Sequence, residues 1–251
     1  GIIKHRVPVV IGERRSETDA VFREVAEAKE APLFFAEDLF SVQHFALHNT
    51  HIAVDVLRQD TGDIQTYLPD LPGIYQCKNL VTTLQSVELL REHFEIGAVG
   101  QAIANTARAT GLLGRWEVLG TQPLVIADVA HNADGITQLV RHIGEMQYKQ
   151  LRIVLGMVND KDTSILSLLP KHATYYFTQA HIPRALDAVI LQREAEKEGL
   201  KGIICDDVNK ALQQAVSTSD PEDLVIVCGS IFLVAEVERD QYVSAPSRSS
   251  A

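Results

Sequence analysis

The composition of this chain is that of an acidic globular protein. Its 251 residues include 33 aspartates and glutamates against 23 lysines and arginines, a formal net charge of −10, and 46% of them are hydrophobic. A nucleic-acid partner held by phosphate neutralisation needs clustered basic residues, so this charge argues against one. No run approaches the roughly 18 apolar residues of a membrane-spanning helix. Three cysteines without a CxxC pair indicate free thiols in a reducing compartment, so we expect a cytoplasmic protein that binds neither membrane nor nucleic acid.

The first half of the chain predicts a parallel crossover followed by antiparallel hairpins. Strand-like residues run from Val7 to Ile11 and from Leu33 to Phe35, and a helical pattern over Glu17–Lys29 joins them. Between Val42 and Leu68 apolar residues alternate at period two, which is typical of antiparallel strands. Two helices are expected next, over Asn79–Arg91 and Glu95–Thr110. The chain opens without a methionine and leads directly into a strand, which we interpret as the interior of a longer protein.

The second half alternates between strands and helices, after a boundary that we place between residues 112 and 113. Five short apolar runs predict strands over Leu124–Asp128, Leu151–Met157, Ala173–Thr178, Gly202–Cys205 and Leu224–Cys228. Each is followed by helical spacing, over Gly135–Gln147, Thr163–Leu169, Arg184–Lys197, Asp207–Val216 and Ile231–Val237. This alternation predicts an α/β fold with a mostly parallel sheet covered on both faces. We assign residues 241–251 to a frayed tail.

A cluster of polar residues stands where the first of these strands gives way to its helix. Asp128 ends the strand, and His131, Asn132 and Asp134 follow before the helical spacing begins. In open α/β sheets ligands bind outside the carboxyl ends of the strands, and a helix N-terminus offers backbone N–H groups to an anion. The cluster therefore indicates either a polar ligand site or a helix cap with His131 merely packed. A metal site is a weaker interpretation, because a metal usually needs about three or four well-placed ligands.

Other polar positions in this half are equally open to two interpretations. Arg115 precedes the lone tryptophan in a glycine turn, where it is either a bidentate phosphate ligand or a solvent-facing linker residue. Ser230 follows the last strand, where it either binds an anion or is an ordinary N-cap. The loop Gly156–Asp162 either holds a ligand or caps the next helix. The sequence contains neither GxGxxG nor GxxxxGK[ST], so the two commonest phosphate-binding loops are absent from these 251 residues.

Seven segments, taken in order, carry a resemblance to a known family: GIIK, VPVVIGE, YQCKNLVTTLQ, LGRW, DVAHN, GMVNDKD and VIVCGS. Together they resemble the C-terminal portion of folylpolyglutamate synthase / dihydrofolate synthase, a member of the Mur-ligase superfamily. The resemblance implies a Rossmann-like, glutamate-binding ligase domain over residues 113–240, preceded by the end of a Mur-ligase central ATP-binding domain over residues 1–112. There are two departures from the family pattern. Leu113 replaces the usual proline before the glycine–arginine pair, and Tyr75 replaces the histidine of the HQxxN motif.

The resemblance also implies an ATP-dependent amide-bond ligase of folate biosynthesis. In this family ATP phosphorylates a carboxylate of dihydropteroate or a folyl-glutamate, and the amine of L-glutamate attacks the acyl phosphate. Such chemistry relies on positioning and on charge neutralisation by Mg²⁺. By position, Asn79, Arg115 and Asp128 match nucleotide-contacting residues. His131, the candidate catalytic residue, and Ser230 match residues that hold the incoming glutamate.

The family's P-loop and Mg²⁺ ligands would lie upstream of this chain, so we expect no metal ligand within it. We expect the chain alone not to ligate, and the full-length protein to ligate as a monomer. Three alternatives remain. One is a non-catalytic module that binds glutamate or a partner, which the absence of GxxxxGK[ST] from the parent reading frame would favour. Another is a metal-dependent hydrolase built on Asp128, His131 and Asp134, and a third is a Mur-type ligase for a different amino acid.

Overall fold

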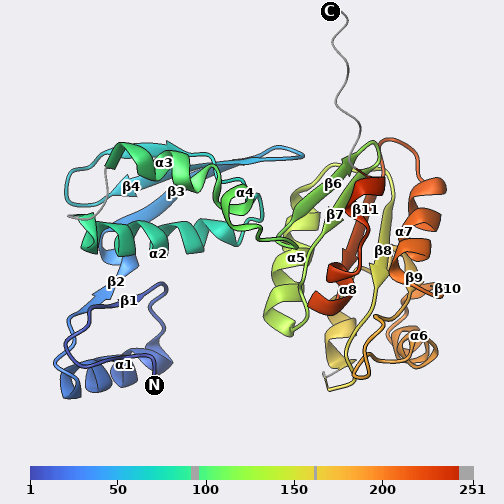
Figure 1. Ribbon diagram of the computed structural model, residues 1–251, viewed down its shortest axis with the longest axis horizontal. Helices are drawn as coiled ribbons and strands as arrows, with labels where there is room; N and C mark the ends of the chain where they lie inside the picture. The colour runs from blue at the N-terminus through green and yellow to red at the C-terminus, as the bar shows by residue number, and fades with distance from the viewer. Residues whose placement is uncertain (92–95, 161–162, 243–251) are drawn as a thin grey trace, which may run out of the picture. The chain divides into compact units, whose positions relative to one another are not determined.

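The computed structural model divides the chain into two compact units, Gly1–Gly111 and Leu112–Ala251 (Figure 1). The structure describes residues 1–91, 96–160 and 163–242. Most of the predicted tail therefore lies outside the described residues, as do Lys161 and Asp162 of the predicted ligand loop. Within the described ranges, no helix is long and apolar enough to cross a membrane.

The first unit opens with a parallel pair of strands. β1 (Val9–Ile11) and β2 (Leu33–Phe35) pair in parallel, and α1 (Ser16–Ala28) connects them. The predicted crossover is thus confirmed. A small core fills the space between the helix and the strands; its buried members are Ile3, Ala26 and Ala31. A single 3₁₀ turn, η1 (Ala36–Asp38), leads to the next sheet.

The rest of the first unit consists of an antiparallel sheet and the helices that follow it in the chain. Its strands β3 (Phe40–Leu47), β4 (Ile52–Arg58) and β5 (Ile64–Tyr67) pair in that order, which confirms the predicted hairpins. Among the described residues three α-helices follow, α2 (Gln76–Leu89), α3 (Ile96–Ile103) and α4 (Thr106–Thr110). The single helix predicted over Glu95–Thr110 is wrong, because the chain leaves the helix at residues 104–105 and begins again at Thr106.

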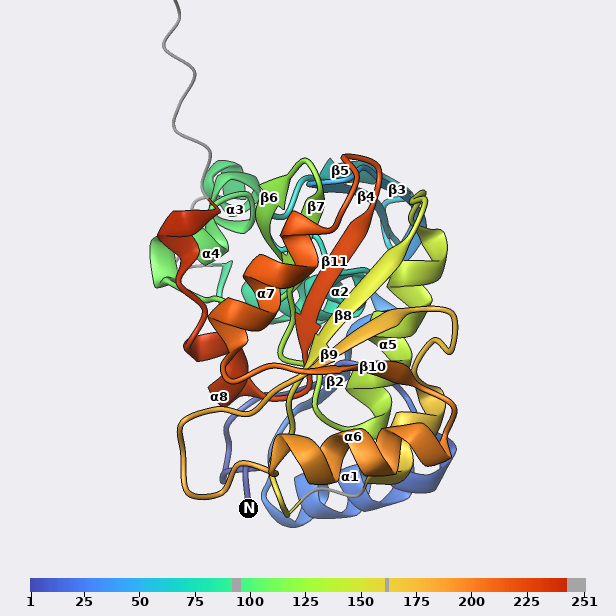
Figure 2. The same ribbon diagram turned by 90° about the vertical axis from the view of Figure 1, so that its right-hand side faces the viewer.

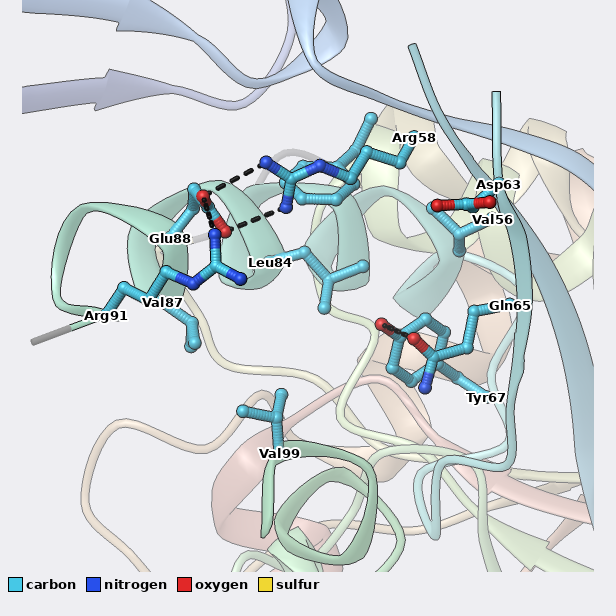
Figure 3. A pocket seen from close by; sticks show the side chains of 11 residues that line it. Val56, Arg58, Asp63, Gln65, Tyr67, Leu84, Val87, Glu88, Arg91 and Val99 are labelled. Carbon is cyan, nitrogen blue, oxygen red and sulfur yellow. Dashed lines mark hydrogen bonds and ion pairs between the residues drawn. The ribbon is translucent and has the colours of Figure 1, made fainter. Parts of the chain in front are cut away.

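A cavity of about 160 Å³ lies between this sheet and the helices (Figure 3). Figure 3 shows Glu88 of α2 between two guanidinium groups. Its carboxylate accepts from Arg58 at 2.9 Å and from Arg91 at 3.2 Å. Tyr67 Oη donates to Gln65 Oε1 at 3.0 Å on the far wall. The polar groups named here are therefore paired in two separate sets, Glu88 with the two arginines and Tyr67 with Gln65.

The second unit is built on one six-stranded sheet (Figure 2). The strand order is β10-β9-β8-β11-β7-β6, and every pairing is parallel except that of β6 with β7. The strands are β6 (Glu117–Thr121), β7 (Leu124–Ala127), β8 (Leu151–Leu155), β9 (Thr174–Phe177), β10 (Lys201–Ile204) and β11 (Leu224–Cys228). The predicted fold class is confirmed, whereas β6 was not predicted.

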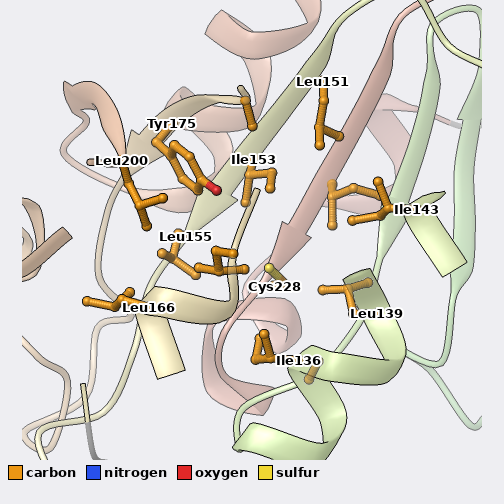
Figure 4. Packing of buried hydrophobic residues seen from close by; sticks show 14 of the residues in the cluster. Ile136, Leu139, Ile143, Leu151, Ile153, Leu155, Leu166, Tyr175, Leu200 and Cys228 are labelled. Atoms are coloured by element: carbon orange, nitrogen blue, oxygen red, sulfur yellow. The ribbon is translucent and has the colours of Figure 1, made fainter. Parts of the chain in front are cut away.

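Helices cover both faces of this sheet, in agreement with the prediction. One face carries α5 (Ala133–Glu145), the 3₁₀ segment η3 (Thr163–Leu168) and α6 (Ala188–Lys197). The other carries α7 (Val208–Ser217) and α8 (Ile231–Ala235). Figure 4 shows Ile136, Leu139 and Ile143 of α5 directed toward Ile153 and Cys228 of the sheet. Successive residues of each strand face opposite sides, and both sides are buried, which explains why the strands are continuous apolar runs.

The order of the strands creates a switch point in this sheet. The chain passes from β7 through α5 to β8, but β11 lies between those two strands. The connections that follow β7 and β11 therefore run to opposite faces, since α5 covers one side and α8 the other. Ligands of open α/β sheets bind at such a point, outside the carboxyl ends of the strands.

Candidate functional site

The carboxyl ends of the three central strands are joined beyond their last ladder residues. Asp128 N donates to Val227 O at 3.0 Å, and Gly229 N donates to Ala130 O at 3.0 Å. On the other side of β11, Gly156 N donates to Cys228 O at 3.3 Å. The segments that follow β7, β11 and β8 are thus fixed side by side, so the residues predicted to bind ligand from β7 and β11 lie at one edge of the sheet.

Asp128 fixes the geometry of this edge from a buried position. Its side chain is 3% exposed, Oδ2 accepts from Trp116 N at 2.9 Å, and Oδ1 accepts from Ala130 N at 2.9 Å. The negative charge of Asp128 and complete burial together raise the pKa of the Cys228 thiol, burial being the larger cause. Cys228 is therefore an inert core thiol and not a nucleophile.

The Gly114–Arg115–Trp116 segment, which we call the arginine turn, is rigidly held. Gly114 and Trp116 have φ values of 69° and 51°, in the left-handed region that favours glycine. Gly114 O accepts from Val129 N at 2.9 Å, and a Cβ on Gly114 would meet Val129 Cγ1 at 2.6 Å. The Trp116 ring, 1% exposed, stacks on His142 of α5 with centroids 3.4 Å apart. This turn is not a loose linker.

Arg115 itself is partly exposed at the top of this turn. Its Nη1 donates to Gly114 O at 3.3 Å. A guanidinium has five N–H donors in a planar fork that matches a phosphate. The side chain thus keeps donors for an anionic ligand, which favours the phosphate-ligand interpretation over that of a linker residue.

His131 and Ser230 lie at the ends of the neighbouring strands β7 and β11. His131 Nδ1 is 2.8 Å from Val129 O, and because a carbonyl only accepts, Nδ1 must carry the proton and Nε2 remains for a ligand. Ser230 is 3% exposed, and its Oγ accepts from Phe232 N at 3.2 Å as the N-cap of α8. Its hydroxyl proton is still able to donate. The N-cap interpretation of Ser230 is therefore correct, and it is compatible with a ligand role.

Comparisons with known proteins find relatives of both the sequence and the fold of this chain. Residues 114–231 match the family model "Mur ligase, glutamate ligase domain". The folylpolyglutamate synthase of Lacticaseibacillus casei is 30% identical over 245 residues, 95% of this chain and 55% of that protein. A folylpolyglutamate synthase structure from Thermotoga maritima has a TM-score of 0.77 at 27% identity, covering 97% of this chain and 56% of the other. A Yersinia pestis folylpolyglutamate synthase/dihydrofolate synthase structure, complexed with AMPPNP and Mn ion, gives 0.75 at 25% identity, covering 97% and 55%.

The chain belongs to the Mur-ligase superfamily. The resemblance drawn from the sequence motifs is confirmed, and the matched model coincides with the second unit from the arginine turn to the start of α8. This Mur-ligase chain spans about half the length of the three proteins just compared.

The Mur-ligase chain does not bring all of its predicted site residues into one unit. Asn79 lies in the first unit, exposed on α2, where its Nδ2 donates to Gln76 Oε1 at 2.7 Å. Asn132 is exposed, and its side chain caps α5 by accepting from Gly135 N at 2.8 Å. Asp134 is exposed in the first turn of α5. The helix-cap interpretation of the polar cluster is thus correct for Asn132, while Asp128 instead holds the arginine turn through Trp116 N.

The described part of this Mur-ligase chain does not fit a resident metal ion. Among those residues, no group of three or more His, Cys, Asp and Glu side chains could hold one. Asp128 directs both oxygens to backbone N–H groups, and Asp134 is exposed. The metal-dependent hydrolase alternative therefore finds no support in the geometry.

Two charged residues that the sequence did not single out support the site. Glu117 Oε2 accepts from Gly114 N at 2.8 Å, and Arg239 donates to both oxygens of Glu117 at 2.7 and 3.0 Å. These two residues are 122 positions apart. An ion pair between residues so far apart in the chain cannot be predicted from the residue spacing of a single sequence. The acidic residue next to the turn, Glu117, was the one signal that could have indicated it.

Proposed function

We propose that this chain supplies the glutamate-ligase portion of an ATP-dependent ligase of folate biosynthesis. The reaction adds L-glutamate to dihydropteroate, to folyl-polyglutamates or to both, through an acyl phosphate. The proposal is supported by the family model, by the folylpolyglutamate synthase relatives, and by the AMPPNP and Mn ion in the Yersinia pestis structure. The P-loop and the Mg²⁺ ligands would come from sequence beyond these 251 residues. Mg²⁺ would supply neutralisation of phosphate charge.

The observation that carries this proposal is the arginine turn clamped to Asp128. The hydrogen bonds from Trp116 N to Asp128 and from Val129 N to Gly114 O hold the turn that carries the Arg115 guanidinium beside the carboxyl end of β7. The strand ends that precede His131 and Ser230 lie next to it. Arg115 would donate to phosphate oxygens of ATP, where charge neutralisation is worth most in a site that excludes water. Asp128 would keep the turn in place and contact the nucleotide, as its position in the family motif implies.

His131 and Ser230 would hold the incoming glutamate. Ser230 Oγ would donate to a glutamate carboxylate. His131 Nε2, the unprotonated nitrogen of the tautomer set by Val129 O, would accept from the attacking amine. Asn79 would contact the nucleotide, as its position in the family motif implies. We further propose that the full-length protein acts in the cytoplasm as a monomer, a state that light scattering on the purified protein would test.

Ligase activity of the full-length protein tests the function. ADP release that depends on both L-glutamate and a folate substrate is expected from the full-length protein and not from the 251-residue chain alone. Arg115→Ala is expected to lower kcat/KM about 100-fold or more, because a phosphate-binding arginine is lost. Arg141→Ala, an exposed arginine on α5, is the matched control and should change little.

Four results would contradict this function. Ligation by the chain alone would mean that a nucleotide site lies within these residues. Full activity of Arg115→Ala would remove the observation on which the proposal rests. An inactive full-length protein that still binds glutamate would favour the non-catalytic module. Activity with another amino acid in place of glutamate would favour a different Mur-type ligase.

A further inference from the structure

We propose that Glu117 and Arg239 are positioning residues for Arg115, an inference that rests on the nucleotide role proposed above. Neither residue belongs to the motifs that carry the family resemblance, and Arg239 lies in the 3₁₀ turn η4 (Arg239–Gln241), beyond the matched glutamate-ligase model. The two side chains instead hold the backbone of the arginine turn and so fix the direction in which Arg115 leaves it.

The first step is the contact between Glu117 and the turn. Gly114 is buried, so its N–H needs a partner, and Glu117 Oε2 accepts from it at 2.8 Å. A buried donor left without a partner is costly, so this bond favours one conformation of the turn. The turn is then held at three backbone points. Its N–H at Gly114 meets Glu117, its carbonyl at Gly114 meets Val129, and its N–H at Trp116 meets Asp128.

The second step is the pairing that holds Glu117 in place. Arg239 Nε donates to Oε1 at 2.7 Å and Nη2 donates to Oε2 at 3.0 Å, a two-pronged ion pair with side chains 21% and 18% exposed. Paired charges of this geometry are stronger and more directional than a single contact. Without Arg239, the carboxylate of Glu117 would be free to turn toward water and release the Gly114 N–H.

The third step links the turn to the helix that begins at Ser230. Arg239 also donates to Val237 O at 3.0 Å and to Val234 O at 3.3 Å, at the carbonyl end of α8. The side chain of Val234 lies 3.0 Å from the position of a Cβ on Gly114. The same arginine therefore ties the end of α8 to the arginine turn, and the proposed nucleotide and glutamate subsites share one support.

The affinity of the full-length protein for ADP tests the inference without requiring turnover. Glu117→Gln and Arg239→Gln are each expected to raise the Kd for ADP about tenfold, because Arg115 loses its fixed position. Arg239→Lys keeps the charge but not the planar fork, and it is expected to restore part of the affinity. Asp220→Asn, which breaks the exposed Lys149–Asp220 pair of the same unit, is the matched control.

Fluorescence of the 251-residue chain gives a second readout at the turn itself. Trp116 is the only tryptophan of the chain and belongs to the arginine turn. Acrylamide should quench it about twice as strongly in Glu117→Gln and Arg239→Gln as in the unsubstituted chain or in Asp220→Asn. Circular dichroism of each variant checks that the fold is kept, and Arg239→Lys serves if a glutamine variant does not fold.

The outcomes separate this inference from the proposed function. Unchanged quenching of Trp116 in both glutamine variants would overturn the inference whether or not the full-length protein ligates glutamate. Changed quenching with an unchanged Kd for ADP would also overturn it, because the turn would then move without consequence for the nucleotide. An unsubstituted full-length protein that binds ADP but does not ligate would count against the function alone.

Discussion

His142 is a buried base stacked on the tryptophan of the arginine turn. It lies 1% exposed on α5, and burial lowers its pKa from 6.5 to about 3. The imidazole is therefore neutral in the folded protein near pH 7, and it stacks on the Trp116 ring with centroids 3.4 Å apart. Its ionisation links the stability of the site to pH.

The sign of this linkage follows from which state binds the proton. Between pH 6.5 and about pH 3 the unfolded chain binds a proton at His142 and the folded chain does not, so acid favours unfolding. The stabilisation is complete above pH 6.5 and is lost as the pH falls toward 3. At pH 5 the loss is about 2 kcal/mol for this group.

Substitution of His142 should flatten this pH dependence. His142→Phe keeps a stacking ring that does not titrate, so its free energy of unfolding should fall about 2 kcal/mol less between pH 7 and pH 5 than that of the unsubstituted chain. Urea unfolding at both pH values measures the difference. His172→Gln, at an exposed position, should retain the full dependence. Equal falls in His142→Phe and the unsubstituted chain would show that His142 is not the responsible group.

The positions of the site residues at the strand ends could be predicted from the sequence, but the contacts that support the arginine turn could not. Asp128, His131 and Ser230 could be placed because an apolar strand followed by helical spacing fixes where the carboxyl end of a strand lies. The residue pattern alone could not decide between the two interpretations of Arg115, because the contacts that hold its turn come from residues distant in sequence. The ring of Trp116 meets α5, and Glu117 is held from 122 residues away.

Helix α5 carries the polar cluster at its N-terminus, and its first turn depends on one cap. Asn132 has extended backbone angles and its Oδ1 accepts from Gly135 N at 2.8 Å. Asn132→Ala should lower the free energy of unfolding by about 1 kcal/mol, because a backbone N–H of the first turn loses its acceptor. Thermal unfolding measures the change, and Asn132→Asp, which keeps an acceptor, should stay near the unsubstituted value. Equal losses in both variants would assign the effect to something other than the cap.

The parallel strands were predicted to within about two residues, whereas the edge strand was missed. β11 was predicted with its observed bounds because a strand buried on both faces is a continuous apolar run. β6 is an edge strand with a register irregularity between Val118 and Gly120, so it lacks both a continuous run and a clean alternation. The helix predicted over Thr163–Leu169 is a 3₁₀ segment over Thr163–Leu168, because over so short a length the apolar spacing of the two kinds of helix is alike.

At the scale of the whole molecule, the buried clusters respect the division into two units. The two clusters of the second unit contain only residues from Trp116 onward, and those of the first unit end at Ile103. The sequence placed its boundary after residue 112 from a change in strand and helix pattern, and the structure divides the chain after Gly111. The pattern of strands and helices was not enough to assign a ligase family. That assignment rested on several sequence motifs that occur in one order.

A fragment of residues 112–242 should therefore fold by itself. It keeps the six-stranded sheet, the helices on both faces and the Glu117–Arg239 pair, so both of its cores remain complete. Urea unfolding followed by Trp116 fluorescence should give one cooperative transition, as is usual for domains of this size.

A fragment of residues 151–242 is the control. It lacks β7 and α5, which leaves β11 without one neighbour and one face without its first helix. That control should show no cooperative transition by circular dichroism. If the longer fragment also failed to unfold cooperatively, its two cores would not suffice, and the second unit would depend on residues outside it.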